Sequence, residues 1–169
     1  IAGFYVPAGY EMIENADDEP ADFQPLAGFP QRVRRRLAPD LDVGQAKTCV
    51  ATTETEFGNM TLVEAARGCP RGCRFCAAGY IYLPFREHSG EHLRREILSE
   101  LKLGDKIGLV AAAVTDYGDL AELGESILDK GGEVSVSSVR IDAVTPEQVR
   151  VLVASGHKTI ALAPEAGSQ

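Results

Sequence analysis

The sequence has no run of about 20 consecutive apolar residues, the length that a membrane-spanning helix requires, and its opening residues lack the apolar core of a secretion signal. It also has no excess of positive charge, because 25 acidic side chains outnumber 17 basic ones and give a net charge of −8. An acidic surface does not attract nucleic acid in general. We therefore expect a cytoplasmic protein that binds neither membranes nor nucleic acid through this part of its chain.

Cysteine is scarce, and its placement argues against a disulfide scaffold. The chain has four cysteines, of which Cys69, Cys73 and Cys76 lie close together. A secreted scaffold spreads its cysteines to connect distant loops, whereas a tight cluster in a reducing compartment usually binds metal. Gly68 and Gly72 allow the backbone to fold tightly around such a group. We interpret Cys49, far upstream, as a buried structural residue.

Three neighbouring thiolates favour an iron–sulfur cluster over a structural zinc ion. Thiolates bind both, but a structural zinc site is closed by four protein ligands, and the loop supplies three. A 4Fe–4S cluster held by three cysteines leaves one iron open. That iron can chelate the amino and carboxylate groups of S-adenosylmethionine.

The chain changes character near residue 60. Residues 1–60 contain an acidic Asp17-Asp18-Glu19-Pro20 run and scattered prolines, and we expect them to form an irregular linker. From residue 61 onward, apolar runs alternate with helical patterns, as in a parallel sheet with crossover helices. Strands are predicted at 61–66, 107–114, 133–140 and 158–163, and helices at 89–103, 119–130 and 145–156.

This rhythm predicts an α/β fold in which residues 61–169 form the first four βα units of a TIM-like barrel. A complete (β/α)8 barrel takes about 250 residues, so we expect only its N-terminal half here. The chain begins with Ile1 rather than Met and ends where a strand should lead into a helix. We therefore expect it to be a piece of a longer polypeptide.

The cysteine spacing also carries a family resemblance. Cys69-x3-Cys73-x2-Cys76, with Phe75 immediately before the third cysteine, resembles the signature of the radical SAM superfamily. The resemblance implies that the three cysteines ligate a 4Fe–4S cluster and that Phe75 lies against the adenine of S-adenosylmethionine. It also implies an enzyme that cleaves S-adenosylmethionine reductively to a 5′-deoxyadenosyl radical, with a flavodoxin or ferredoxin as reductant.

Within the superfamily, the sequence looks most like proteins that carry an N-terminal cobalamin-binding domain. The similar segments are the 64–80 run around the cysteines, Arg86-Glu87-His88-Ser89, Phe4-Tyr5-Val6-Pro7 and Thr55-Glu56-Phe57-Gly58. His88 stands where that group more often has Arg. The leading interpretation is a transferase that moves a methyl group to an unactivated carbon, with cobalamin bound by a domain outside this chain. The alternatives are a methylthiotransferase acting on RNA or a ribosomal protein, and a non-catalytic iron–sulfur protein for electron transfer or redox sensing.

Polar residues at the carboxyl ends of the predicted strands are candidate cofactor contacts, because the chemistry of a barrel lies at that end. Thr115 and Asp116 replace the Gly-rich strand end at which the superfamily usually holds the methionine amino group. Ser138 and Arg140 are candidates for the methionine carboxylate or the ribose, and Glu165 for the ribose or the substrate. We expect His92 to be exposed on its helix, His157 to be a solvated loop residue, and the basic cluster Arg32, Arg34, Arg35 and Arg36 to be a solvated patch.

Replacing any one of Cys69, Cys73 or Cys76 with Ala is expected to abolish the 4Fe–4S cluster formed on anaerobic reconstitution, because no fourth thiolate is nearby. Cys49→Ala should keep it. Iron and sulfide content and the visible absorption spectrum measure both outcomes. Stoichiometric zinc without iron uptake by the unchanged protein would show that the cluster interpretation is wrong.

Overall fold

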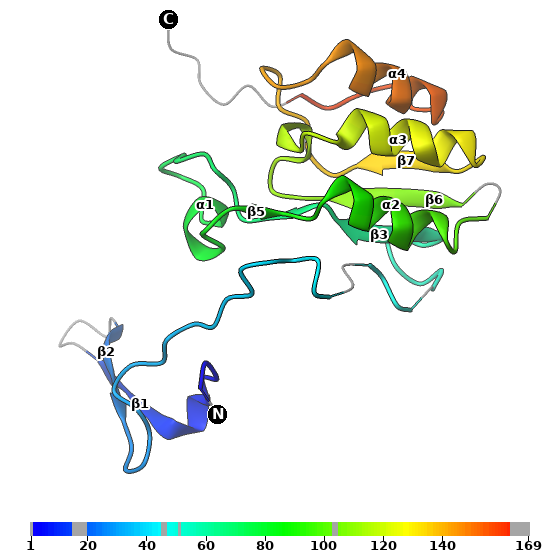
Figure 1. The fold of residues 1–169 in the computed structure, drawn as a ribbon. Helices are drawn as coiled ribbons and strands as arrows, with labels where there is room; N and C mark the ends of the chain where they lie inside the picture. The colour runs from blue at the N-terminus through cyan, green and yellow to red at the C-terminus, as the bar shows by residue number, and fades with distance from the viewer. Residues whose placement is uncertain (1, 15–19, 45–46, 51, 103–104, 163–169) are drawn as a thin grey trace, which may run out of the picture. The chain divides into compact units, whose positions relative to one another are not determined.

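The computed structural model describes residues 2–14, 20–44, 47–50, 52–102 and 105–162 (Figure 1). The chain divides into two compact units, residues 1–38 and residues 39–169, which are described separately below. Within the described part of the chain, no helix is both long and apolar enough to cross a lipid bilayer.

The first unit contains a β-hairpin. A 3₁₀-helix η1 (Pro7–Gly9) precedes strand β1 (Tyr10–Glu14), which pairs antiparallel with β2 (Pro20–Pro25). The expectation that residues 1–60 are irregular is therefore wrong for this stretch. Both prolines of β2 stand at its two ends, where a missing N–H interrupts the ladder least. The Tyr10 ring packs 4.9 Å from Tyr5 and 5.9 Å from Phe29, measured between ring centroids, which gives the unit a small aromatic cluster.

The second unit is built on a three-stranded parallel sheet in the order β3 (Met60–Glu64), β6 (Lys106–Val110) and β7 (Glu133–Val136). Val63 lies opposite Leu109, and Leu109 lies opposite Val136. The strands follow one another in chain order, as in a singly wound (β/α) sheet. This confirms the predicted α/β class with a parallel sheet. Three strands do not close a barrel.

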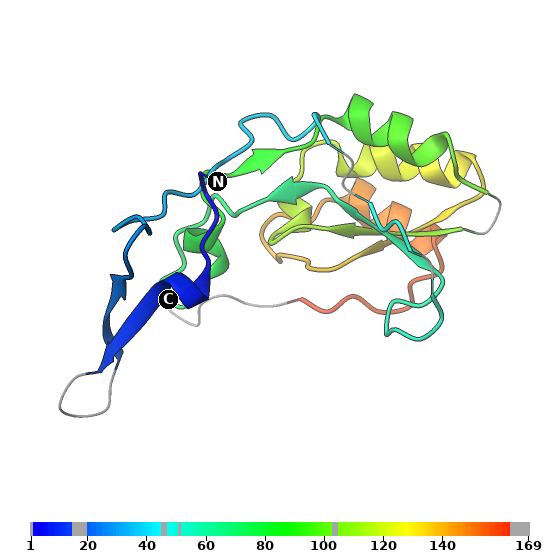
Figure 2. The same ribbon diagram turned by 90° about the horizontal axis from the view of Figure 1, so that it is seen from below.

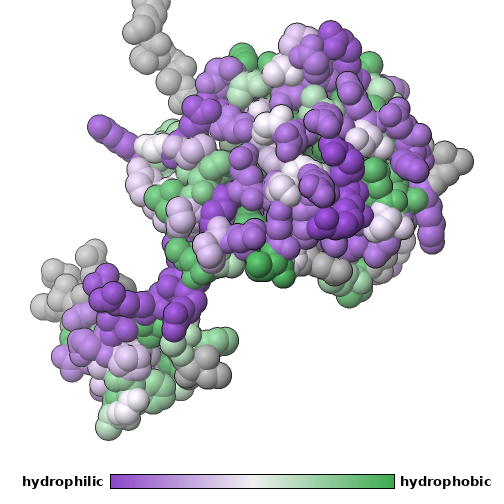
Figure 3. Space-filling model, viewed as in Figure 1, coloured by the Kyte–Doolittle hydropathy of each residue, from purple (hydrophilic) through white to green (hydrophobic). Residues whose placement is uncertain are grey.

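Three helices lie side by side along one face of this sheet: α2 (Gly90–Leu98), α3 (Leu120–Asp129) and α4 (Pro146–Ala154) (Figure 1, Figure 2). Their solvent-facing side is mostly hydrophilic in Figure 3, as expected of amphipathic helices. Two of these helices begin with a side-chain cap. The Ser89 hydroxyl accepts a hydrogen bond from the backbone N–H of His92, and Thr145 and Gln148 form a complete capping box.

The core lies between the sheet and the helices, and α3 occupies its centre. Its largest fully buried side chains are Val63, Leu93, Leu109, Val114, Leu123, Ile127 and Val134. The apolar run predicted as a strand at 107–114 supplies part of this core, but its strand stops at Val110. The chain then continues through the 3₁₀-helix η2 (Val114–Asp116).

The fourth predicted strand, 158–163, is absent from the described residues 158–162, and Ala163 lies outside them. Side chains occupy the outer edge of β7 instead. The Val134 N–H donates to the Ser155 hydroxyl at 2.9 Å, and the Val134 carbonyl oxygen lies 3.0 Å from His157 Nε2. These contacts satisfy the backbone N–H and carbonyl of Val134, and the described residues 158–162 form no strand beside β7. His157 is therefore a partly buried edge contact rather than the solvated residue that we expected.

Leu123→Ala is expected to lower the free energy of unfolding by about 2–5 kcal/mol, because it removes a fully buried side chain from the middle of α3. Val153→Ala, on the exposed side of α4, is the control and should change it by at most about 0.5 kcal/mol. Chemical denaturation of both variants measures the difference. Equal effects would contradict the position of α3 at the centre of the core.

Candidate functional site

A short antiparallel ribbon closes the loop that carries the three cysteines. Strand β4 (Ala66–Arg67) pairs with β5 (Arg86–Glu87), so residues 68–85 leave and return at the same place. Gly68 has a φ of 86°, and a Cβ there would come within 2.6 Å of the Tyr82 carbonyl oxygen. Glycine is therefore needed where the two ends of the loop pass each other. The short helix α1 (Ala78–Ile81) lies within the loop.

The three loop cysteines line one cavity of about 400 Å³. All three are free thiols with intermediate exposure, and the Cys76 N–H donates to the Cys73 carbonyl oxygen at 3.1 Å. Cys49 is also free, but it is exposed and does not line this cavity, so its predicted burial is wrong. A single loop therefore supplies all the cysteine ligands that the site offers within the described residues.

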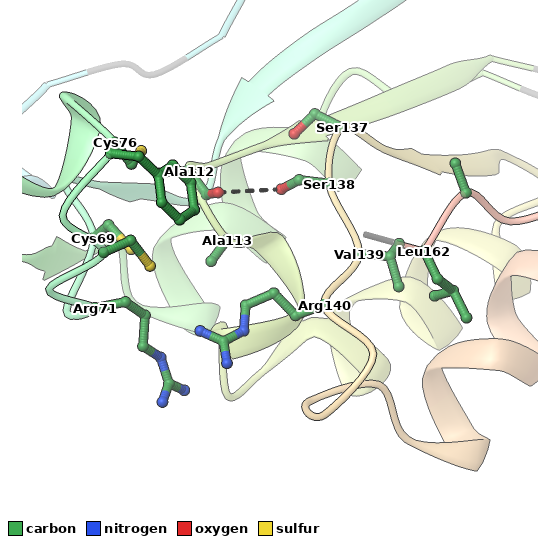
Figure 4. A pocket seen from close by; sticks show the side chains of 13 residues that line it. Cys69, Arg71, Cys76, Ala112, Ala113, Ser137, Ser138, Val139, Arg140 and Leu162 are labelled. Carbon is green, nitrogen blue, oxygen red and sulfur yellow. Dashed lines mark hydrogen bonds between the residues drawn. The ribbon is translucent and has the colours of Figure 1, made fainter. Parts of the chain in front are cut away.

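The opposite wall of the cavity comes from the carboxyl ends of β6 and β7. Figure 4 shows Cys69 and Cys76 on one side and Ser137, Ser138 and Arg140 on the other. The remaining lining residues are Arg71, Cys73, Phe75, Ala112, Ala113, Val139, Ala161 and Leu162. Of the sequence-predicted contacts, the structure thus brings Phe75, Ser138 and Arg140 to the cavity beside the cysteines. A volume of about 400 Å³ lies within the roughly 300–1,000 Å³ of small-molecule sites.

Ser138 joins the segments that follow the two strands. Its hydroxyl donates to the Ala111 carbonyl oxygen at 3.3 Å and accepts from the Val114 N–H at the same distance (the weaker contact to Ala112, 3.5 Å, is dashed in Figure 4). The predicted strand 133–140 ends at Val136, so the alternation expected for residues 137–142 does not apply. Irregular backbone instead lets all of 137–140 line the cavity.

Thr115 and Asp116 lie behind the cavity wall, in η2 rather than at a strand end. Neither lines the cavity, but both hold residues that do. Thr115 Oγ1 accepts from the Arg140 N–H at 3.1 Å. The Asp116 carboxylate accepts from Arg71 Nε and Nη2, each at 3.0 Å, and lies 3.8 Å from Arg140 Nη1. These two residues therefore position the guanidinium groups of the site.

Arg140 is held between two carboxylates. The hydrogen bond to Asp142 is the main cause that raises the pKa of Arg140 above its usual value, with a further contribution from the Asp116 charge. Its side chain is 16% exposed, whereas that of Arg71 is 46% exposed. The cavity thus holds two guanidinium groups, each paired with a carboxylate, whose remaining N–H donors can bind a carboxylate ligand.

Sequence reasoning missed Arg71. A basic residue between the first two cysteines is visible in the sequence. Its partner Asp116, however, is 45 positions away along the chain. Glu165, the remaining predicted contact, lies outside the described residues.

The donor set fits the cofactors that the sequence suggested. The three free thiols can supply thiolate ligands to iron, and the cavity beside them is lined by small alanines and two guanidinium groups. The alanines leave room, and the guanidinium groups complement a negatively charged end of a ligand. The site can therefore hold an iron–sulfur cluster with an amino-acid-derived cofactor next to it.

Asp116→Asn is expected to loosen the cysteine loop, because it removes the charge that binds Arg71 bidentately. Amide hydrogen exchange across residues 68–77 should become faster. Asp142→Asn is the matched control, since Asp142 contacts Arg140 but is 60% exposed and does not hold the loop. Unchanged exchange in Asp116→Asn would show that the ion pair does not order the loop.

Comparison with known proteins agrees with this geometry. A family model described as the radical SAM superfamily matches residues 63–169, the part of the chain that contains the parallel sheet and the cysteine loop. The uncharacterized protein MJ0966 of Methanocaldococcus jannaschii is 38% identical to the chain over 118 residues. That alignment covers 69% of this chain and 26% of the relative, so the chain spans about a quarter of the length of that relative.

Proposed function

Because the chain belongs to the radical SAM superfamily, we propose that it is the part of a radical SAM enzyme that holds the 4Fe–4S cluster and S-adenosylmethionine. Cys69, Cys73 and Cys76 are the proposed cluster ligands. The observation that supports this proposal is that the three thiols line the same cavity as the segments following β6 and β7. Ligands and cofactors bind at the carboxyl ends of the strands in such folds.

The bound cluster and S-adenosylmethionine would supply, on one-electron reduction, a 5′-deoxyadenosyl radical, which is chemistry that no side chain provides. The protein's own residues bind and orient. In this proposal Arg140 pairs with the methionine carboxylate, with Asp116 fixing the guanidinium from behind. Ala112 and Ala113 leave space beside the cysteines, and Phe75, 75% exposed at the cavity rim, is placed to cover an adenine.

A link to cobalamin is a second, more specific proposal about the reaction. It is supported by the similarity of the 4–7 and 55–58 segments to proteins that join a cobalamin-binding domain to the core. Phe4, Tyr5 and Val6 are all at least 48% exposed, and an exposed apolar segment suits contact with a further domain. The proposed reaction is then methyl transfer in the cytoplasm, with a flavodoxin or ferredoxin as reductant.

The direct test is anaerobic reconstitution followed by a reducing assay for 5′-deoxyadenosine. The polypeptide that contains the complete barrel should release it from S-adenosylmethionine, and the Cys73→Ala variant should not. A cluster-loaded enzyme that binds S-adenosylmethionine but forms no 5′-deoxyadenosine under reduction would favour a non-catalytic iron–sulfur protein. Methylated product that depends on added cobalamin would support the proposal of cobalamin-linked methyl transfer.

Arg140→Ala is expected to weaken S-adenosylmethionine binding about tenfold or more without loss of iron, because a hydrogen bond to a charged group contributes about 1.5–3 kcal/mol. Arg150→Ala, on the exposed side of α4 and 71% exposed, is the matched control. Titration of the cluster absorption with S-adenosylmethionine measures both affinities. Equal affinity in the two variants would assign Arg140 a structural role only.

A further inference from the structure

Outside the cavity, one group of side chains gathers as metal ligands do. Asp42 lies in the segment 39–44, His88 follows β5 directly, and His92 stands four residues later in the first turn of α2. Each offers one ligand atom, and these atoms lie within 4.8 Å of one another. His88 precedes the helix N-cap Ser89, and the His88-x3-His92 spacing is common among metal-binding histidine pairs.

Both histidines are buried and incompletely paired. His88 is 2% exposed and His92 is 6% exposed, and their nearly parallel rings lie 5.3 Å apart. His88 Nδ1 lies 3.1 Å from Asp42 Oδ1, and Arg95 Nη2 lies 3.2 Å from His92 Nδ1. The Nε2 atoms of both rings are buried without any hydrogen-bond partner. Buried polar atoms are nearly always paired, so these two rings hold unused capacity for a hydrogen bond or a ligand.

The immediate surroundings suit a cation. The Asp42 carboxylate lies against His88 Nδ1, and the Asp119 carboxylate accepts from the Gly90 N–H between the two histidines. The Tyr117 hydroxyl donates to the His88 carbonyl oxygen. The cation nearest the rings, Arg95, is 62% exposed and can swing into solvent.

We propose that Asp42, His88 and His92 bind a divalent transition-metal ion of the Zn²⁺ class, separately from the thiolates of the cysteine loop. Two nitrogens and one oxygen are suitable ligands for such an ion, and water completes a tetrahedral set. Ligand atoms about 2 Å from zinc lie about 3.3 Å apart in a tetrahedron, close to the 3.1 Å between His88 Nδ1 and Asp42 Oδ1. An ion bound by these two atoms replaces the hydrogen bond between them, so His88 binds it through Nδ1 and not through its orphaned Nε2.

The third ligand needs only a local adjustment. His92 moves toward the other two by rotation of its side chain, which releases the contact with Arg95. The Asp42 carboxylate already accepts from the Ser89 N–H and hydroxyl, and these bonds fix its orientation while lone pairs remain for a metal. The Asp42 side chain is 28% exposed, which gives the ion a route from solvent.

The role of the ion follows from what the ligands connect. Asp42 belongs to a segment without regular structure, whereas His88 and His92 join the end of β5 to α2. The metal thus braces residues 39–44 against the base of the cysteine loop. It is a structural site, because none of its ligands lines the cavity.

The test separates this site from the thiolates. A variant of the full chain with Cys69, Cys73 and Cys76 all changed to Ser is titrated with Zn²⁺ alone, and bound metal and the thermal midpoint are measured. About one Zn²⁺ per chain should bind and raise the midpoint. Adding His92→Ala should weaken Zn²⁺ binding at least about tenfold, because one of the three protein ligands is lost. Adding His157→Ala, a histidine contact outside the site, should leave the affinity unchanged.

Two further variants keep the test decisive. His92→Gln and Asp42→Asn retain polar side chains of similar size and should show the same weakening if His92→Ala proves unstable by circular dichroism. Failure of the triple-Ser protein to bind Zn²⁺ would overturn the proposal and leave Asp42 as a hydrogen-bond acceptor at the start of α2. Zn²⁺ affinity in the histidine and aspartate variants equal to that of the triple-Ser protein would overturn it as well. Neither result bears on the cluster or on S-adenosylmethionine.

Discussion

The arrangement of the site depends on one nearly buried carboxylate. Asp116, with a side chain 6% exposed, binds Arg71 of the cysteine loop bidentately and faces Arg140 from the segment after β7. It thereby connects two parts of the chain that no backbone ladder joins. Two guanidinium groups at one cavity would otherwise repel each other, and the shared counter-ion keeps both in place.

The small size of the sheet explains why so much of the site is irregular. Strands β6 and β7 end at Val110 and Val136, and the cavity is lined by the irregular residues that follow them directly. Their continuations are fixed by hydrogen bonds from side chains, chiefly those of Ser138 and Thr115, instead of a regular ladder. Gln148 adds a bond from α4 to the Thr115 carbonyl oxygen, so the helix layer supports the cavity wall from outside.

The features that could be predicted from the sequence are those that depend only on residues close together along the chain. The helix starts near residues 89 and 145 are encoded within a few neighbouring residues, by the Ser89 cap and the Thr145 capping box, and both helices begin where we expected them. The contacts of Arg71 with Asp116 and of Asp42 with His88 join residues 45 and 46 positions apart, and no local pattern indicates them. The burial of His92 and the absence of a fourth strand likewise depend on tertiary neighbours. A periodic apolar pattern cannot show that Ser155 and His157 bind the backbone of Val134 at the edge of β7.

The β4–β5 ribbon has a consequence for how the protein tolerates damage. It fastens both ends of the loop 68–85 to the body of the fold, with the Ala65 N–H bound to Val110 and its carbonyl oxygen bound to the His88 N–H. Because the ribbon ties the loop at its base, loss of order within residues 68–85 need not spread into the helices and the sheet.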